Sequence, residues 1–394
     1  MTIDELRTTV RGPVIQRNDP GFAEELLGQN LHILHTPELV VGAACTSDVQ
    51  AAVRYAAEHL LHVSVLATGH EAQEPITAGL VITLKRLSTI SIDQTARTAT
   101  VGGGGRTGEV AEAAARFGLA PVTGSATTVR LTGLVLGGGL GPLARSHGYC
   151  SDYVNQFTVV IPTGEVITAD KGTNPDLFWA LRGGKGGFGV VVATQLRLVD
   201  LKTFYGGSVA FAEDDIETVL RGWVEWTRTA PQQVTTSVAI MRFPPTPEIP
   251  EFMRGKTFLM LRFAYPGSAE EGQRLSAPLL TLAEPAFGEL GELPADHLGT
   301  MHGDPTEPMV SWTDGTMLNG LDDSFATTLL DTAGEGRQTP FMSIELRHLG
   351  GATHIDVPEG SAASGRSSEY SLYVVGAPDP NTASLGCSGW SNLV

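Results

Sequence analysis

Cysteine is scarce in this chain: three occur among 394 residues, with no Cys-x-x-Cys pair and no metal-ligand spacing. The sequence therefore predicts no metal site. An odd, scattered set of cysteines is typical of a reducing compartment. Long apolar runs are missing too, and the first residues, MTIDELRTTVRG, lack the apolar core of a signal peptide. We therefore expect a cytoplasmic protein without a membrane partner.

Positive charge is also low. Lys and Arg number 26 against 43 Asp and Glu, which gives a formal net charge of −17. No cluster of basic residues is long enough to neutralise a run of phosphates, which argues against nucleic acid as a partner. The same acidity disfavours binding to an anionic membrane surface. Neither of these polyanionic partners is expected.

Glycine, by contrast, is plentiful: 47 residues gathered in clusters, which indicate backbone that approaches a ligand closely. A chain of this length usually forms two domains. Residues 38–200 alternate strand and helix patterns, whereas residues 201–376 predict a separate antiparallel sheet with helices on one face. Residues 284–320 are rich in Pro, Gly and Asp, so we expect long loops there.

The strongest local signal is the segment from Gly124 to Gly141, GSATTVRLTGLVLGGGLG. Its hydroxyls and glycines expose backbone N–H groups of the kind that bind a pyrophosphate. A purely structural glycine loop is the alternative.

Another run, Gly102–Gly108, precedes a predicted helix as in nicotinamide-nucleotide sites, but no acid ends a following strand. A nicotinamide-dependent dehydrogenase is therefore the weaker interpretation.

Two shorter segments accompany this signal. His70 lies in the loop Ala67–Glu71, directly after a predicted strand at 63–66, where a lone histidine is more often a solvated bystander than a functional group. Residues 182–191, RGGKGGFGVV, contain five glycines before a buried strand, more than a helix-to-strand connector requires. Taken singly, each segment allows a structural explanation.

In this order and spacing, the three segments resemble the FAD-binding domain of the vanillyl-alcohol oxidase and berberine-bridge-enzyme family, over about residues 35–200. The stretch Asn174–Gly184, NPDLFWALRGG, resembles a further signature of that family. The resemblance implies an α+β fold: a PCMH-type FAD-binding domain of two α/β subdomains, and a substrate domain whose antiparallel sheet is covered by helices. It also implies FAD as the cofactor, with a ring nitrogen of His70 bonded covalently to the flavin.

The resemblance carries the family's cofactor contacts over to this chain. The first segment would hold the flavin tether, and the second would hold the pyrophosphate, the ribityl chain and the edge of the ring. The residues implied to bind FAD are Ala67, Thr68, Gly69, His70, Glu71, Ala72, Gly124, Ser125, Thr128, Val129, Thr132, Gly133, Gly138, Gly139, Gly141, Gly189 and Val190. Ala126 stands where some members carry a second, cysteinyl tether, so a single covalent bond is implied. Cys150 is interpreted as a buried thiol.

The implied domains are an N-terminal segment (1–34), the FAD-binding domain (35–200), the substrate domain (201–376) and an atypical short tail (377–394). Members of the family usually continue with a segment that returns to cover the flavin, and residues 386–394 resemble nothing in it. A shortened, non-catalytic flavin-binding homologue is therefore a rival interpretation.

The implied activity is that of an FAD-dependent oxidoreductase. It would move a hydride from a small alcohol- or amine-type substrate to flavin N5, with O2 or another electron acceptor reoxidising the flavin. In residues 342–349, MSIELRHL, period-two alternation puts Glu345 beside Arg347 on one sheet face, which makes Glu345 the first candidate for the general base. Tyr370 and Tyr373 are the next candidates. An exposed Glu–Arg ion pair of little energetic weight is the alternative.

Overall fold

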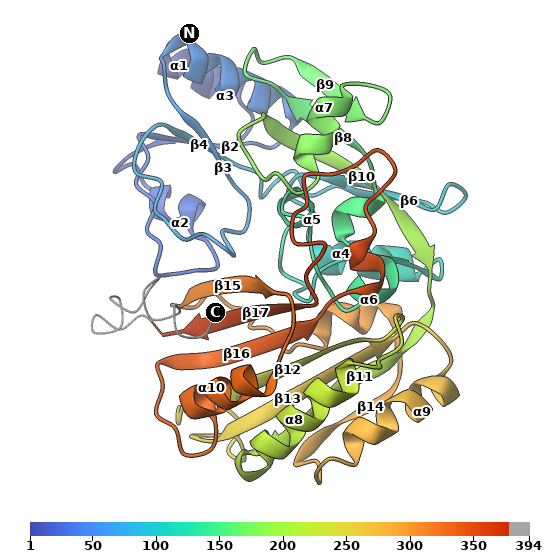
Figure 1. The fold of residues 1–394 in the computed structure, drawn as a ribbon. Helices are drawn as coiled ribbons and strands as arrows, with labels where there is room; N and C mark the ends of the chain where they lie inside the picture. The colour runs from blue at the N-terminus through green and yellow to red at the C-terminus, as the bar shows by residue number, and fades with distance from the viewer. Residues whose placement is uncertain (378–394) are drawn as a thin grey trace.

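The structure, a computed structural model, describes residues 1–377 and contains three β-sheets (Figure 1). The smallest sheet has the order β1-β2-β4-β3, in which β2, β4 and β3 are parallel and β1 is antiparallel to β2. Its strands are β1 (Val14–Gln16), β2 (Leu39–Gly42), β3 (Val63–Leu66) and β4 (Leu80–Thr83). Its helices are α1 (Ile3–Thr9), α2 (Phe22–Leu26) and α3 (Thr46–Glu58). Residues of β2 and β4 are buried on both faces of the sheet, which explains their unbroken apolar sequences.

The second sheet is antiparallel, in the order β5-β6-β10-β8-β9, and β7 pairs with the end of β10. Its strands are β5 (Ile90–Asp93), β6 (Thr98–Gly102), β7 (Leu119–Pro121), β8 (Val154–Val160), β9 (Val166–Asp170) and β10 (Val190–Asp200). The helices of this part are α4 (Thr107–Ala115), α5 (Leu131–Leu136), α6 (Ala144–His147), the 3-10 helix η1 (Cys150–Tyr153) and α7 (Pro175–Leu181). The fold is of the predicted α+β class.

The glycine run after β6 has a packing role. A Cβ on Gly104 would lie 1.9 Å from the carbonyl oxygen of Leu84, and one on Gly102 would lie 2.3 Å from that of Leu87. Moreover, β6 pairs antiparallel with both β5 and β10, so the run does not belong to the parallel strand–helix–strand unit of nicotinamide-nucleotide sites. The structure therefore gives no support to the dehydrogenase interpretation.

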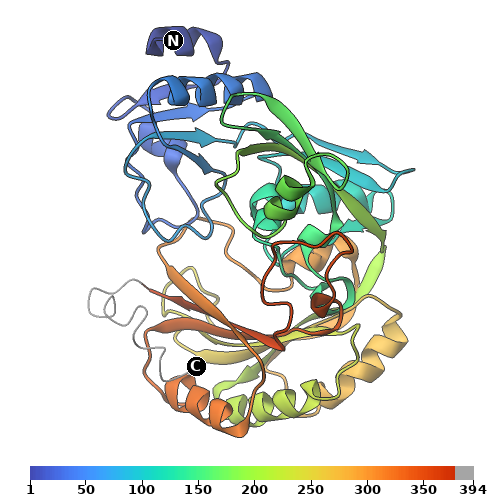
Figure 2. The ribbon, with the colours of Figure 1, turned by 45° about the horizontal axis from the view of Figure 1, so that its top comes forward.

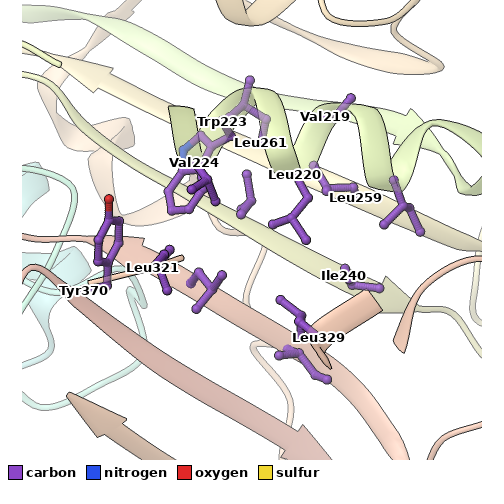
Figure 3. Packing of buried hydrophobic residues seen from close by; sticks show 14 of the residues in the cluster. Val219, Leu220, Trp223, Val224, Ile240, Leu259, Leu261, Leu321, Leu329 and Tyr370 are labelled. Atoms are coloured by element: carbon purple, nitrogen blue, oxygen red, sulfur yellow. The ribbon is translucent and has the colours of Figure 1, made fainter. Parts of the chain in front are cut away.

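The third sheet is antiparallel throughout, in the order β14-β11-β13-β12-β16-β17-β15. Its strands are β11 (Thr203–Ala212), β12 (Thr235–Arg242), β13 (Thr257–Tyr265), β14 (Phe287–Pro294), β15 (Trp312–Leu318), β16 (Phe341–His348) and β17 (Tyr370–Gly376). Helices α8 (Ile216–Thr227), α9 (Ala269–Leu280) and α10 (Asp323–Ala333) lie on the side away from the first two sheets (Figures 1 and 2). Between helices and sheet lies an apolar core that includes Trp223, Leu220 and Leu329 (Figure 3). The predicted sheet with helices on one face is confirmed.

One stretch differs from the prediction. Residues 284–320, expected to be long loops, contain β14, the 3-10 helix η3 (Ala295–Thr300) and β15. The two strands are the edges of the third sheet, and edge strands tolerate glycine, proline and charge more readily than interior strands do. In β14, Gly288 has a φ of 83°, and Glu289 and Glu292 are exposed. The glycines and charges of this edge strand therefore made its sequence resemble that of a loop.

The second and third sheets are joined at residues 201–202, between β10 and β11, and we propose the predicted domain boundary there. From residue 378 onward, the predicted tail lies outside the described residues. The same is true of residues 386–394, which motivated the interpretation as a shortened homologue. Within residues 1–377, no helix combines the length and the apolar character needed to cross a bilayer.

Arg145 of α6 links the second sheet's part of the chain to the third sheet, and we call its contacts the Arg145 latch. Its Nε donates to the carbonyl oxygen of Val234 at 2.8 Å, and its Nη1 donates to that of Leu349 and lies 2.9 Å from Nε2 of His348. The residue is 5% exposed. Burial lowers the pKa of Arg145 to about 10, so the guanidinium stays charged at neutral pH.

Candidate functional site

Three glycine-containing segments that the sequence analysis singled out meet in the structure. We call them, in chain order, the first, second and third loop: residues 67–72, 124–141 and 182–191. The backbone N–H of Arg130 in the second loop donates to Oγ1 of Thr68 in the first, at 3.1 Å. The backbone N–H of Lys185 in the third loop donates to the carbonyl oxygen of Leu136 in the second, at 2.7 Å. The second loop therefore connects the other two.

The first loop follows β3 at the carboxyl end of a parallel strand, the edge at which α/β sheets bind ligands. Its backbone is held on both sides of His70. Gln29 N donates to the carbonyl oxygen of Thr68 at 2.8 Å, and Asn30 Nδ2 donates to that of Ala72 at 3.3 Å. Nδ1 of His70 is buried and has no hydrogen-bond partner among residues 1–377. The loop thus presents an imidazole nitrogen that the described chain leaves unsatisfied.

The glycines of the second and third loops are of two kinds. A Cβ on Gly141 would lie 1.8 Å from the carbonyl oxygen of Thr123, and Gly189 has a φ of 142°, so the chain's own packing requires glycine at both positions. Gly133 and Gly186, by contrast, have no heavy atom within 4 Å of a Cβ position. Packing gives no reason for glycine at these two positions, and the open space beside them fits a ligand that approaches the backbone.

Several predicted cofactor residues of the second loop already bind other parts of the chain. The hydroxyl of Thr132 is buried 3.0 Å from that of Thr194, which already occupies one of its hydrogen-bonding positions. The carbonyl oxygens of Gly138 and Gly139 accept from the backbone N–H groups of residues 151 and 150, each at 2.9 Å. The remaining predicted residues lie in the same three loops: Ala67, Gly69, Glu71, Gly124, Thr128, Val129 and Val190.

The face of the third sheet that the helices leave uncovered meets the second loop. On β16, Ile344 and Leu346 belong to the helix-covered core, and the alternate residues Glu345 and Arg347 occupy the opposite face. Nη2 of Arg347 lies 3.4 Å from Oγ of Ser125 in the second loop. The structure therefore brings Arg347 to the second loop, and Glu345, the first base candidate, lies behind it as its ion-pair partner.

Glu345 lies at the centre of a buried ion cluster. Its Oε1 accepts from Ser237 Oγ at 2.8 Å and from Arg262 Nη1 at 3.0 Å, and its Oε2 accepts from Arg347 Nε at 2.9 Å. The residue is 5% exposed, so the alternative of an exposed ion pair is wrong. Burial opposes the carboxylate charge, but Arg347 and Arg262 outweigh it and hold the pKa of Glu345 well below its usual range.

His302 completes this cluster, and the sequence analysis missed it. The residue follows η3, and its Nε2 lies 3.4 Å from Oε1 of Glu345. Burial, and then the charge of Arg262, lower the pKa of His302 to about 4, although Glu345 opposes the shift. The ring is therefore neutral at pH 7, and its Nδ1 has no hydrogen-bond partner in the described part of the chain. No sequence signal marks it, because its partners come from strands distant along the chain.

Tyr370 is turned away from the three loops. It is 6% exposed and lies in the helix-covered core (Figure 3), where its Oη is 2.7 Å from Oγ1 of Thr227 in α8. Leu372 and Val374, which share its side of β17, belong to the same core. Tyr370 therefore does not reach the site, which corrects its inclusion among the candidate bases.

Tyr373, on the other side of β17, faces the site. It is the partner of Glu345 across the β16–β17 ladder. The pKa of Tyr373 is raised above its ordinary value: burial and the charge of Glu71 in the first loop raise it, and a hydrogen bond with Thr313 and the charge of Arg347 oppose them only in part. Tyr373 is thus close enough to the first loop and to Arg347 for their charges to act on it.

Two small cavities adjoin these residues. One, of about 10 Å³, lies between the second loop at Gly124 and η3, and the other, of about 20 Å³, is lined by Gly141, Arg262, His302 and Arg347. Each has room for about one water molecule and neither could enclose a dinucleotide. A dinucleotide would instead have to lie along the loops themselves. The unsatisfied His70 nitrogen and the open space at Gly133 fit such a ligand.

In a comparison with protein families, residues 37–170 match the FAD binding domain. Among curated proteins, (R)-6-hydroxynicotine oxidase of Paenarthrobacter nicotinovorans is 37% identical over 196 residues, 49% of this chain and 43% of that protein. An FAD-linked oxidoreductase of Dictyostelium discoideum is 24% identical over 376 residues, 94% of this chain and 80% of that protein. The chain spans about half the length of several curated relatives that it matches, 43% and 53% of two of them.

Solved structures share the fold over nearly the whole chain. The berberine-bridge-enzyme-like protein 1 of Physcomitrella patens superposes with a TM-score of 0.84 at 20% identity, covering 100% of this chain and 87% of that one. Xylooligosaccharide oxidase of Myceliophthora thermophila, solved with xylobiose, gives a TM-score of 0.80 at 23% identity, covering 100% and 87%. These structures confirm the predicted PCMH-type fold, and the match to the FAD binding domain confirms FAD as the cofactor.

Proposed function

We propose that this chain, which carries an FAD-binding domain at residues 37–170, is an FAD-dependent oxidoreductase acting on a small alcohol- or amine-type substrate. When bound, FAD supplies the hydride acceptor at its N5. The observation that carries the proposal is the meeting of three parts of the chain. The first loop contacts the second through Thr68 and Arg130, and the second loop contacts the polar sheet face through Ser125 and Arg347.

We further propose that His70 is the covalent attachment point of the flavin. The support is local: the backbone around His70 is held from both sides, whereas its buried Nδ1 has no partner among the described residues. An imidazole nitrogen left unsatisfied in this way is available for a bond to a bound group. Ala126 in the second loop has no side-chain nucleophile, so we propose a single tether.

The test is acid precipitation of the purified protein. We expect the yellow colour to stay in the pellet of the unmodified protein and to move to the supernatant after His70→Ala. The matched control is His62→Ala, an exposed histidine just before β3, which should keep its colour in the pellet. Flavin that remains in the pellet of His70→Ala would refute the tether, whereas a colourless unmodified protein would refute the proposed function.

We propose Tyr373 as the group that accepts the substrate proton, at its Oη. Glu345 was the first candidate, but its oxygens already accept from a serine and two arginines, and its low pKa makes it a weak base. Burial raises the pKa of Tyr373 above its ordinary value, and Arg347 only partly opposes this shift, so Tyr373 can accept the proton only where alkaline pH ionises its phenol. We therefore assign Glu345 the role of holding the guanidinium groups of Arg262 and Arg347 at the site.

Removal of this base is testable in steady-state kinetics. Tyr373→Phe should lower kcat by about 100-fold or more, the usual contribution of a positioned base. It should also remove the rise in kcat with increasing pH that ionisation of the Tyr373 phenol would give. Tyr370→Phe is the matched control because it removes a hydroxyl from the same strand on the other face, and it should leave kcat near that of the parent. Equal losses in the two variants would contradict the assignment.

The acceptor that reoxidises the flavin, O2 or another compound, is part of this proposal, as is a cytoplasmic location. The location is supported by the scattered cysteines, of which Cys150 is fully buried.

Substrates named for relatives include a hydroxynicotine and a xylooligosaccharide. For this chain, the buried charges of the sheet face support a polar substrate that accepts or donates hydrogen bonds.

A further inference from the structure

Arg130 lies at the junction of the first two loops with no acidic partner. Its backbone N–H binds Thr68, and its Nη1 donates to the carbonyl oxygen of Gly104. Its Nε is buried without a hydrogen-bond partner among residues 1–377, and the guanidinium forms no ion pair there. Glu109 attracts it from a distance, but that carboxylate accepts from the backbone of Arg106. The positive charge of Arg130 is therefore uncompensated.

Lys85, just after β4, is a second cation of this kind. Its Nζ donates to the carbonyl oxygens of Glu25 at 2.8 Å and of Leu27 at 3.1 Å, and no carboxylate binds it within the described chain. The side chain of Glu25 is taken by Arg86, whose Nη1 and Nη2 donate to its two oxygens at 2.8 and 2.7 Å. Glu25, whose charge attracts Lys85, is thus already paired with Arg86.

The two cations flank the first loop. Lys85 binds Leu27, and the two residues after Leu27 pack against the loop: a Cβ on Gly28 would lie 3.4 Å from the carbonyl oxygen of Thr68, and the N–H of the next residue donates to that oxygen. Arg130 is anchored beside the same Thr68 by its backbone N–H, and its guanidinium extends from there to the carbonyl oxygen of Gly104. Burial lowers the pKa of Lys85, the charge of Glu25 opposes this shift, and the neighbouring charges of Arg86 and Arg130 add to it, so the three cations act on one another.

Half-buried cations without a counter-charge are unfavourable, because burial removes hydration that no partner replaces. They are unexpected in a chain with a net charge of −17. Burial also lowers the pKa of Arg130, and Arg106 lowers it further. A ligand that brings two negative charges to the first loop would remove this penalty.

We propose that Arg130 and Lys85 bind the pyrophosphate of the dinucleotide and neutralise its two charges. The proposal rests on the proposed function, since it concerns the cofactor of that site. Charge-assisted hydrogen bonds to phosphate oxygens are about twice as strong as neutral ones. The two side chains would therefore add to the preference that backbone N–H groups give for FAD over a flavin without phosphate.

The experiment measures reversible flavin binding in the His70→Ala background, by quenching of flavin fluorescence, with FAD and with riboflavin. Arg130→Met and Lys85→Met should each weaken FAD binding about tenfold or more, and should leave riboflavin binding within about twofold. FAD binding by the parent should weaken as salt rises, and less steeply in the variants. The thermal midpoint of the flavin-free protein should not fall in Arg130→Met, because an uncompensated charge has been removed.

The matched control is Arg106→Met, which removes an exposed cation from the same neighbourhood. It should change the FAD affinity by less than about twofold, because solvent screens an exposed charge. Equal weakening of FAD and riboflavin in Arg130→Met would overturn the proposal by showing a structural role, as would an unchanged FAD affinity. A His70→Ala protein that binds neither flavin would instead refute the proposed function.

Discussion

The cofactor loops and the polar face of the third sheet form one site in different ways. In the loops, the residues that matter follow one another along the chain, and a few hydrogen bonds such as Arg130 to Thr68 bring the segments together. On the sheet face, Ser237, Arg262 and Glu345 come from three strands and meet through strand pairing, and His302 reaches them from the segment after η3. The comparison teaches that a contiguous cradle can be recognised in a sequence, whereas a charge cluster built across strands cannot.

The largest effect should come from the centre of the cluster. Glu345→Gln keeps the shape of the side chain but leaves Arg262 and Arg347 buried without their counter-charge. We expect a loss of about 3–5 kcal/mol in the free energy of unfolding, measured by denaturant titration. The control is Glu271→Gln, which breaks an exposed pair with Arg274 on α9 and should lose less than about 1 kcal/mol. Similar losses would mean that the cluster is no stronger than a surface pair.

A smaller effect should follow from pH. The folded pKa of His302 is lowered to about 4, whereas the unfolded value is about 6.5. The unfolded state therefore binds more protons between these values, so stability falls as the pH drops through this window. Between pH 7.5 and 5, His302 should account for a loss of about 2 kcal/mol in the free energy of unfolding.

The variant His302→Gln isolates this contribution. It should show a shallower dependence on pH over the same range, even if it is less stable at pH 7.5. His348, whose pKa is lowered to about 3 by burial and then by Arg145, contributes in the same direction and remains in the variant. An unchanged pH dependence in His302→Gln would contradict the assignment.

The smallest effect should come from the loops. Thr68→Val removes the acceptor of the Arg130 N–H and should lower the free energy of unfolding by about 1 kcal/mol. Acid-stable flavin should also incorporate more slowly, because the first two loops are then less firmly joined. Thr77→Val, at an exposed threonine beyond the first loop, should change neither. A loss as large as that of Glu345→Gln would remove the contrast between the two regions.

The sequence predicted the cofactor half well for a physical reason. The glycines, His70 and the hydroxyls lie in short segments, and close backbone packing at Gly141 and Gly189 leaves its mark directly on residue type. Edge strands such as β14 are harder to recognise in a sequence, because their exposed positions can be occupied by glycines and charged residues.

The sequence of β17 already indicates which of the two tyrosines faces the site. Tyr370, Leu372 and Val374 alternate along β17, so their shared apolar side already indicates that Tyr370 lies in the core and Tyr373 does not. His302 and Arg262 had no such signal. Their role depends on which strands are neighbours, and β13 and β16 are brought to either side of β12 only by the fold.

The Arg145 latch has a consequence for protein engineering. Its arginine belongs to the segment that follows the second loop, while Val234, His348 and Leu349 belong to the other half. A chimera that takes its substrate half from a relative would separate the donor from its acceptors, even if the crossover fell neatly at residues 201–202. If the residue at position 145 is taken from the same relative as the substrate half, the arginine and its acceptors come from one protein and their contacts can be kept.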